Sequence, residues 1–376
     1  MDECHSPGRR GVVLDRENLR GESSAPSRDE EMLNLFRRWP KVDLHRHLEG
    51  SLRFSTILEL ATSGRIDLPR ETASLKSLVQ VQPGDSRDPR TFLSKFDALR
   101  RVYRSPEIIQ RVTRESIEDA AADGVCYLEL RFTPVAMAHA MAFPLRDVIH
   151  WITDATRNAS EQTGVNVGLI ASVNRHEPVD QAEEVARRAC EFAGRGIVAL
   201  DLAGDEGGFS AEPFIPTFRE ARRAGLGITV HAGEWGDGVS VRHALRDMDA
   251  DRIAHGVRVL EDPEAVELAL SRRTVFEVCL TSNLLSGVVD RLDNHPLIRM
   301  LEAGLQVTLN TDDPGICSTS MTQEMLAAVS SLGFSPESLK GLILAAVQGS
   351  FLPSAARRRL EREVQTVLWQ DGESVA

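Results

Sequence analysis

Histidine and carboxylate residues stand at the ends of several short apolar runs, in patterns that suit metal-assisted hydrolysis. The candidates are His45 and His47, His231 and Glu234, His255, and the pair Asp312 and Asp313. One residue separates His45 from His47, so on a strand both imidazoles point to the same side. Imidazoles and carboxylates suit zinc or a similar divalent ion, which lowers the pKa of bound water toward ~7. A nearby histidine could then act as base and a protonated glutamate as acid.

Each of these patterns also has an ordinary structural explanation when it is taken alone. A single buried histidine is more often a hydrogen-bonded core residue, and Asp-Asp-Pro is commonly a turn. A site is favoured because each pattern closes a separate predicted strand. The remaining histidines lack this placement, and we expect them to be structural or exposed: His5, His139, His150, His176, His243 and His295.

The elements that must position these residues are eight apolar runs that alternate with segments of helical period. The runs start at Lys41, Gly124, Val165, Gly196, Gly225, Arg252, Thr274 and Gln306. Near-continuous apolar runs are typical of parallel strands buried on both faces. Helices are predicted over 178–193, 213–224 and 262–270, and another one begins after Ser335. This alternation predicts a (β/α)8 barrel, in which reacting groups lie at the carboxyl ends of the strands.

The domain organisation follows from the spacing of the runs. The first two runs start at Lys41 and Gly124, much farther apart than one crossover helix requires, so we expect a helical insertion that could cover the barrel mouth. Residues 1–35 are polar and aperiodic, which predicts a flexible tail. Residues 36–370 are expected to form a single barrel domain.

Composition excludes several kinds of partner and cofactor. The 44 basic and 56 acidic residues give a net charge of −12, which argues against a nucleic-acid partner. No stretch approaches the ~20 apolar residues of a membrane span. The cysteines number five and form no CxxC pair, so we expect a cytoplasmic protein without a disulfide framework. No lysine occurs between Lys95 and Lys340, so a carbamylated lysine cannot bridge two metals near the fourth strand, and a one-metal site is favoured.

Six motifs, taken together and in order, resemble the adenosine deaminase family of the amidohydrolase superfamily. They are PKVDLHRHLEGSLR, DLAGDE, HAGE, RIAHGVRVLED, TSN and LNTDDP. The resemblance runs from Lys41 to about residue 315 and implies one zinc ion per chain. The zinc ligands that it implies are His45, His47, His231 and Asp312. Zinc deaminases of the unrelated cysteine-ligated fold need a P-C-x-x-C motif, which is absent from this sequence.

The resemblance also implies roles for the residues that would meet a purine. His255 would orient and deprotonate the water, and Glu234 would protonate N1 so that C6 becomes electrophilic. Asp313 would hold the water and engage N7. The backbone N–H of Gly204 would meet N3, because a residue without Cβ lets the backbone approach a ring closely. His47 would border the substrate as well as the metal.

Glu49 departs from the family pattern, since many adenosine deaminases carry Asp at this position, where it meets a ribose hydroxyl. Adenine-specific relatives carry Glu there, and the longer side chain could shorten the sugar pocket. NTDDP and HRHLEGSLR, in contrast, favour the nucleoside branch. Trp235 could shape the ribose side or pack against the barrel rim. Arg131 and Ser282-Asn283 could support the site or the fold.

The leading hypothesis is therefore zinc-dependent deamination of adenosine and 2′-deoxyadenosine, with a small-molecule purine as the only partner. Adenine or aminodeoxyfutalosine is the alternative within the class. N6-methyl-AMP ranks lowest because the sequence shows no phosphate cradle. A different barrel hydrolase, such as a phosphoesterase or lactonase, has no need of Glu234 to protonate a ring nitrogen. A non-catalytic binding protein is disfavoured because every expected catalytic residue is present.

Overall fold

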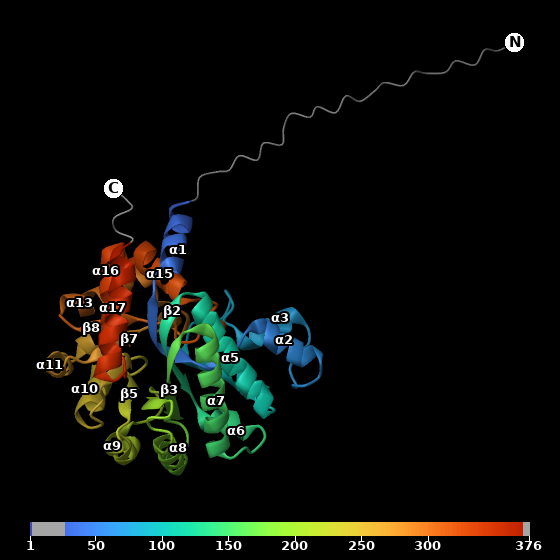
Figure 1. The fold of residues 1–376 in the computed structure, drawn as a ribbon, viewed down its shortest axis with the longest axis horizontal. Coiled ribbons are helices and arrows are strands. Elements are labelled where there is room, and N and C mark those ends of the chain that lie inside the picture. The colour runs from blue at the N-terminus through green and yellow to red at the C-terminus, as the bar shows by residue number, and fades with distance from the viewer. Residues whose placement is uncertain (2–26, 371–376) are drawn as a thin grey trace.

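The computed structural model describes residues 1 and 27–370, and within them eight parallel strands pair in chain order, β1 to β8 (Figure 1). The strands are β1 (Lys41–His47), β2 (Val125–Phe132), β3 (Asn166–Asn174), β4 (Ile197–Ala203), β5 (Gly227–Ala232), β6 (Arg252–His255), β7 (Val275–Val278) and β8 (Gln306–Leu309). Each strand begins within two residues of the start of one of the eight apolar runs. The predicted (β/α)8 barrel is confirmed.

The barrel closes through the segment that follows β8. Asp312 forms a parallel bridge with Arg46, its N–H donates to the carbonyl of His45 at 2.8 Å, and its own carbonyl accepts from the N–H of His47 at 2.8 Å. The side-chain carbonyl of Asn310 accepts from the N–H of Leu44 at 3.0 Å. The first and last strands are therefore joined at residues that the sequence analysis assigned to the site.

Helices cover the outside of the strands (Figure 1). They are α7 (Leu145–Thr163), α8 (Val179–Glu191), α9 (Ile215–Arg223), α10 (Gly238–Arg246), α11 (Pro263–Arg272), α13 (Leu297–Glu302), α15 (Met321–Leu332), α16 (Pro336–Gly349) and α17 (Ser354–Gln370). Ser335 caps α16 as predicted, because its hydroxyl accepts from the N–H of Ser338. No helix among the described residues has the length and apolar content that a bilayer span requires.

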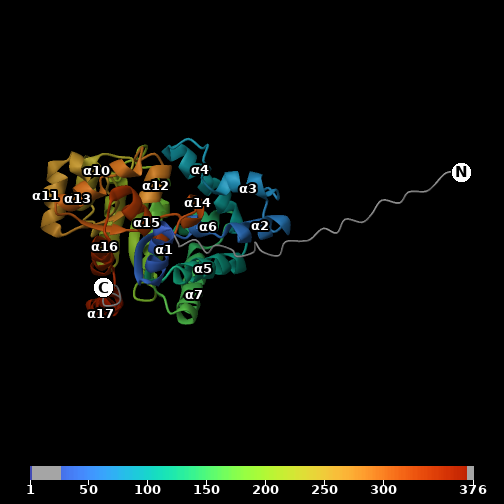
Figure 2. The same ribbon diagram turned by 90° about the horizontal axis from the view of Figure 1, so that it is seen from above.

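The predicted insertion after the first strand is confirmed and consists mainly of four helices. They are α2 (Phe54–Thr62), α3 (Thr72–Val79), α4 (Pro89–Leu99) and α5 (Pro106–Ala122). Asp88 and Ser105 cap α4 and α5, and each cap is followed by a proline in the first turn. Figure 2 shows α2, α3 and α4 together on one side of the barrel.

The N-terminal segment is helical where the structure describes it. Helix α1 (Arg28–Arg38) starts with a capping box between Ser27 and Glu30 and buries Phe36. It begins inside the predicted flexible tail of residues 1–35, because the capping box and the Phe36 contact outweigh the polar composition. Residues 2–26, where the rest of that prediction falls, lie outside the described part of the chain.

Charged side chains fill part of the barrel interior. Arg252 pairs with Glu129 and lies 2.5 Å from Glu277, and all three side chains are buried. The ring of Phe351 lies 3.9 Å from the Arg252 guanidinium, and the backbone N–H of Phe351 donates to Glu129 at 2.7 Å. The link between α16 and α17 thus packs against this buried charge network.

Candidate active site

Strands far apart in the sequence bring the predicted histidines into one cluster. The ring centre of His45 lies 5.2 Å from that of His47, 4.9 Å from that of His231 and 4.8 Å from that of His255. His45 and His47 end β1, His231 lies on β5, and His255 is the last residue of β6. The expected convergence at the carboxyl ends of the strands is therefore present.

Asp312 lies in the middle of this cluster. One of its carboxylate oxygens is 3.1 Å from Nε2 of His45 and 3.4 Å from Nε2 of His47, and the other is 3.8 Å from Nε2 of His255. Burial would raise the pKa of Asp312, but the adjacent imidazoles hold it well below its usual range. Burial also lowers the pKa of His47 and keeps this ring neutral, as a metal ligand must be.

The donor set fits a metal ion. His45, His47 and Asp312 form one group with metal-compatible spacing, and His45, His231 and His255 form another. Within the described residues, the buried Nε2 of His45 makes no hydrogen bond of acceptable geometry, although it faces the Asp312 carboxylate at 3.1 Å; Nδ1 of the same ring contacts Glu277 at 2.8 Å. A buried nitrogen left without a partner is costly unless a ligand engages it.

Carboxylates behind the cluster orient two of the rings. Glu277 contacts Nδ1 of His45 at 2.8 Å, and Asp201 contacts Nδ1 of His231 at 3.0 Å. Each carboxylate holds the Nδ1 proton, which leaves Nε2 free for a metal. Arg131 lies between them, 2.7 Å from Glu277 and 3.5 Å from Asp201. Arg131 was predicted from the sequence as a possible supporting residue, whereas both carboxylates were missed, because their one signal was a charge inside an otherwise apolar strand.

The backbone is strained at two residues of the cluster. His255 has φ = 60° and Asp312 has φ = 59°, in the left-handed region that non-glycine residues seldom adopt. Such strain costs of order 1–3 kcal/mol and persists where the surrounding structure enforces it, typically at functional sites. Here the strain directs both side chains into the cluster at the ends of β6 and β8.

Two buried carboxyl groups border the cluster with raised pKa values. Burial raises the pKa of Glu234 well above its usual range, and the charges of Asp312 and Glu206 raise it further. Burial and Asp312 likewise raise the pKa of Asp313. Gly50 lies so close to Asp313 that a Cβ at position 50 would stand 1.7 Å from its Oδ1. Because its pKa is raised, Glu234, which lies 3.6 Å from His255, can remain protonated near neutral pH and donate a proton.

Glu206 holds the loop that carries Glu234, a role that the sequence analysis missed. Its carboxylate accepts four backbone N–H groups, from residues 233 to 236, at 2.7–3.0 Å. Glu206 is the last residue of the DLAGDE motif, from which only Gly204 was given a role. The motif therefore contributes Glu206, which supports the HAGE loop, as well as Gly204, whose backbone was expected to contact the substrate.

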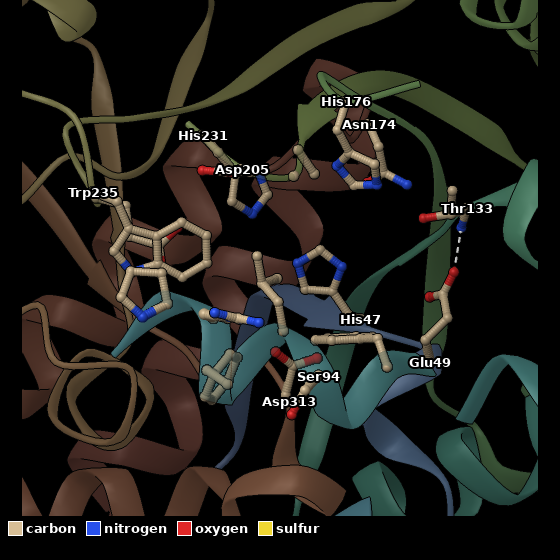
Figure 3. Close-up of a pocket in the computed structure, with 18 of the residues that line it drawn as sticks. His47, Glu49, Ser94, Thr133, Asn174, His176, Asp205, His231, Trp235 and Asp313 are labelled. Atoms are coloured by element: carbon tan, nitrogen blue, oxygen red, sulfur yellow. Dashed lines mark hydrogen bonds between the residues drawn. The ribbon is translucent and has the colours of Figure 1, made fainter. Parts of the chain in front are cut away.

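A cavity of about 820 Å³ opens onto the cluster (Figure 3). It is lined by Glu49, Gly204, Trp235, His176 and residues of α4, together with the candidate site residues His47, His231, Glu234, His255, Asp312 and Asp313. Glu49 points to Thr133 and accepts its N–H at 2.6 Å, as Figure 3 shows. His176 was expected to be structural or exposed, yet it lies beside Gly204 at the cavity wall because β3 ends next to β4.

A parallel eight-stranded barrel with a histidine–carboxylate cluster at the carboxyl ends of its strands defines the class of metal-dependent barrel hydrolases. A model of the adenosine deaminase family matches residues 40–367. The adenosine deaminase of Salmonella newport (strain SL254) is 37% identical over 328 residues, which cover 86% of this chain and 97% of that protein. The chain belongs to the adenosine deaminase family, whose members are metal-dependent hydrolases of C–N bonds in cyclic amidines.

Solved structures of other deaminases have the same fold. The adenine deaminase from Arthrobacter aurescens aligns with a TM-score of 0.80 at 29% identity, covering 87% of this chain and 98% of that one. The N6-mAMP deaminase from Arabidopsis aligns with a TM-score of 0.79 at 29% identity, covering 89% and 99%. Fold similarity thus extends over enzymes with different 6-aminopurine substrates.

Proposed function

We propose that this protein deaminates adenosine and 2′-deoxyadenosine to the corresponding inosines and ammonia. The observation that carries the proposal is the buried Glu234 carboxyl, whose pKa is raised, beside a histidine–aspartate cluster. An acid of this kind is needed to protonate a ring nitrogen of a purine, whereas hydrolysis of an ester does not require it. The 37% identity to an adenosine deaminase supports the same substrate.

The proposed cofactor is one zinc ion, with His45, His47, His231 and Asp312 as its ligands. Zinc bound there would supply an activated water near neutral pH. The support is the unpaired Nε2 of His45 among the described residues and the carboxylates that fix Nδ1 of His45 and His231. Neutral histidines with a protonated Nδ1 present Nε2 to a metal.

The proposed substrate contacts use the groups that line the cavity. Glu234 would protonate N1, Asp313 would engage N7 and the attacking water, and the N–H of Gly204 would meet N3. His255, which also lines the cavity, would face the reacting carbon through its Nε2. His47 would lie against the purine on the metal side, and Trp235 lines the same cavity.

Glu49 is proposed to face the sugar. One of its oxygens accepts from Thr133, while the buried second oxygen has no hydrogen-bond partner within residues 27–370. A ribose hydroxyl could satisfy that oxygen. The longer side chain also keeps adenine as the alternative substrate, since the adenine deaminase from Arthrobacter aurescens shares the fold.

The charge of the cavity favours a neutral nucleoside over a nucleotide. Away from the metal cluster, the acids Asp88, Asp97 and Asp205 line it with two arginines, while burial raises the pKa values of its carboxyl groups Glu49, Glu234 and Asp313. A 5′-phosphate would bring further negative charge into this surrounding, and like charges repel strongly where water is scarce. Deamination of N6-methyl-AMP therefore ranks below deamination of adenosine.

The test is a substrate panel with the zinc-loaded protein. Adenosine, 2′-deoxyadenosine, adenine, aminodeoxyfutalosine and N6-methyl-AMP are compared by ultraviolet absorbance and by ammonia release. We expect the highest kcat/KM for adenosine and its deoxy form, and Glu234→Gln should abolish most of the activity while zinc stays bound. Turnover of adenine with inert adenosine would reject the proposal.

We further propose that the enzyme works in the cytoplasm with a small-molecule purine as its partner. The support is the odd number of cysteines, five in the sequence, and the free state of the four that the structure describes. Fractionation of the source cells would test the location.

A further inference from the structure

A chain of three buried hydrogen bonds runs from a helix start to the cluster. The N–H of Leu297 donates to Nδ1 of His295 at 3.1 Å. Nε2 of His295 lies 3.1 Å from the side-chain oxygen of Asn283, and the amide nitrogen of Asn283 lies 3.1 Å from Nδ1 of His255. The three side chains are 4%, 0% and 1% exposed, so water does not compete for these contacts.

The backbone N–H of Leu297, at one end of this series of hydrogen bonds, fixes the donor and acceptor in each of them. Leu297 is the first residue of α13, where N–H groups lack partners inside the helix, and a backbone N–H can only donate. Nδ1 of His295 must therefore accept, which places the proton of the neutral ring on Nε2. Burial lowers the pKa of His295 to about 3, and the charge on Arg299 acts in the same direction, so this ring stays neutral.

The orientation of Asn283 follows from His295. Nε2–H of His295 donates to the amide oxygen, so the NH₂ group of Asn283 must face His255. An amide nitrogen has no lone pair to offer, so Nδ1 of His255 can only accept. The neutral His255 ring must then carry its proton on Nε2.

We propose that Asn283 and His295 are positioning residues that hold His255 as the Nε2–H tautomer, with a hydrogen-bond donor facing the reacting atoms. Nε2 of His255 lies 3.6 Å from Glu234 and 3.8 Å from Asp312, so this proton points into the cluster. The inference rests on the proposed deaminase function and narrows it. A ring that already carries a proton on Nε2 can orient an attacking oxygen by donating to it, but it cannot remove a proton there. Of the two roles expected for His255, orientation fits and deprotonation does not.

The sequence signals for this chain were present but separate. The TSN motif contains Asn283, which was named as a supporting residue, whereas His295 was left structural or exposed. His295 is indeed buried, and it reaches Asn283 because the segment after α12 (Leu280–Leu285) folds back onto that helix. Nothing in the spacing of the two residues shows that contact.

The test reads the tautomer directly in the full-length, zinc-loaded protein labelled with ¹⁵N-histidine. We expect His255 to show an acceptor-type Nδ1 and a protonated Nε2 in its ¹⁵N spectrum. Asn283→Asp keeps the shape but presents two acceptors, which should move the His255 proton to Nδ1. We expect kcat to fall by up to about 10⁴-fold, the loss that follows when a catalytic histidine is held in the wrong tautomer.

A matched pair at His295 separates positioning from packing. His295→Gln keeps a donor toward Asn283 and should retain the His255 pattern, whereas His295→Phe keeps the bulk without the donor and should give mixed tautomers. A protonated Nδ1 in the wild type, or an unchanged pattern in Asn283→Asp, would overturn the inference. Failure of the proposed function looks different, since the wild type would then show the expected tautomer without turning over adenosine.

Discussion

Three acidic side chains that line the cavity have pKa values shifted in opposite directions. Neighbouring imidazoles hold the pKa of Asp312 down, while burial holds the pKa values of Glu234 and Asp313 up. Groups whose surroundings push their pKa values apart take opposite roles in acid–base chemistry. At the scale of single residues, Asp312 is thus suited to bind a cation and Glu234 to donate a proton.

The raised pKa of Glu234 predicts how activity depends on pH. The active form is the protonated one, so kcat should be constant below the raised pKa of Glu234 and should fall as the pH rises through it. Glu234→Gln should lower kcat by roughly 10²–10⁴-fold and remove this alkaline decline, because an amide does not titrate. Measured kcat–pH profiles of both proteins check this, and an alkaline decline that persists in the variant would assign it to another group.

The sequence predicted the site residues better than it predicted their supports. The histidines and Asp312 were visible because unusual residue types follow apolar runs. Glu206, Asp201 and Glu277 were not assigned, because a single carboxylate in a strand or loop shows its partner only in three dimensions. Their partners lie 27 or more residues away in the chain.

At the scale of elements, the loop after β5 depends on one carboxylate. Glu206→Ala would remove the acceptor of four N–H groups and let Glu234 move. A displacement of about 1 Å can cost ~10²-fold in rate, so kcat/KM should fall by that order while zinc content remains. Glu206→Gln keeps an oxygen acceptor and should give a smaller loss. Steady-state kinetics with metal analysis check this, and wild-type kcat/KM in Glu206→Ala would contradict it.

Helix α15 carries a second testable carboxyl group, Glu324, which is buried and accepts from Thr281 and Thr319. Burial raises its pKa from 4.5 to about 7. The folded state therefore binds this proton more tightly than the unfolded state, and stability is lost as the pH rises from about 4.5 through 7. The loss amounts to about 3 kcal/mol.

Glu324→Gln should remove this dependence on pH. The variant should be more stable than the wild type above pH 7 and should approach it below pH 5, since the neutral amide mimics the protonated acid. Urea unfolding at several pH values measures the difference. If the free energies of unfolding of the two proteins changed equally with pH across this range, the raised pKa of Glu324 would be contradicted.

Prediction of elements succeeded where the chain repeats one simple pattern. Eight apolar runs gave eight strands, because parallel strands covered on both faces leave few polar positions. The insertion was predicted as helical, but α2 to α5 were not placed individually. Their packing over the barrel depends on contacts with distant segments, which periodicity does not encode.

At the scale of the whole molecule, buried charges join the barrel to its C-terminal helices. Arg252→Met would leave Glu129 and Glu277 with one cation fewer in the interior, so the free energy of unfolding should fall by about 3–5 kcal/mol. Arg258→Met is the matched control, because its pair with Glu261 is exposed and should change stability by less than about 1 kcal/mol. Chemical denaturation measures the free energy of unfolding of both variants. Equal losses would contradict the claim that the buried Arg252 pairs stabilise the fold more than the exposed Arg258 pair.

The hydrogen bonds that close the barrel between β1 and the segment after β8 affect the order in which the protein folds. His45 and His47 lie on the first strand and Asp312 follows the last one, and the hydrogen bonds between these segments join the two ends of the sheet. Contacts between such distant segments form late, because closing a long loop is entropically costly. A refolding chain can therefore regain helices and most strand pairs before it regains any catalytic centre. Recovered activity would report that the ring of strands has closed.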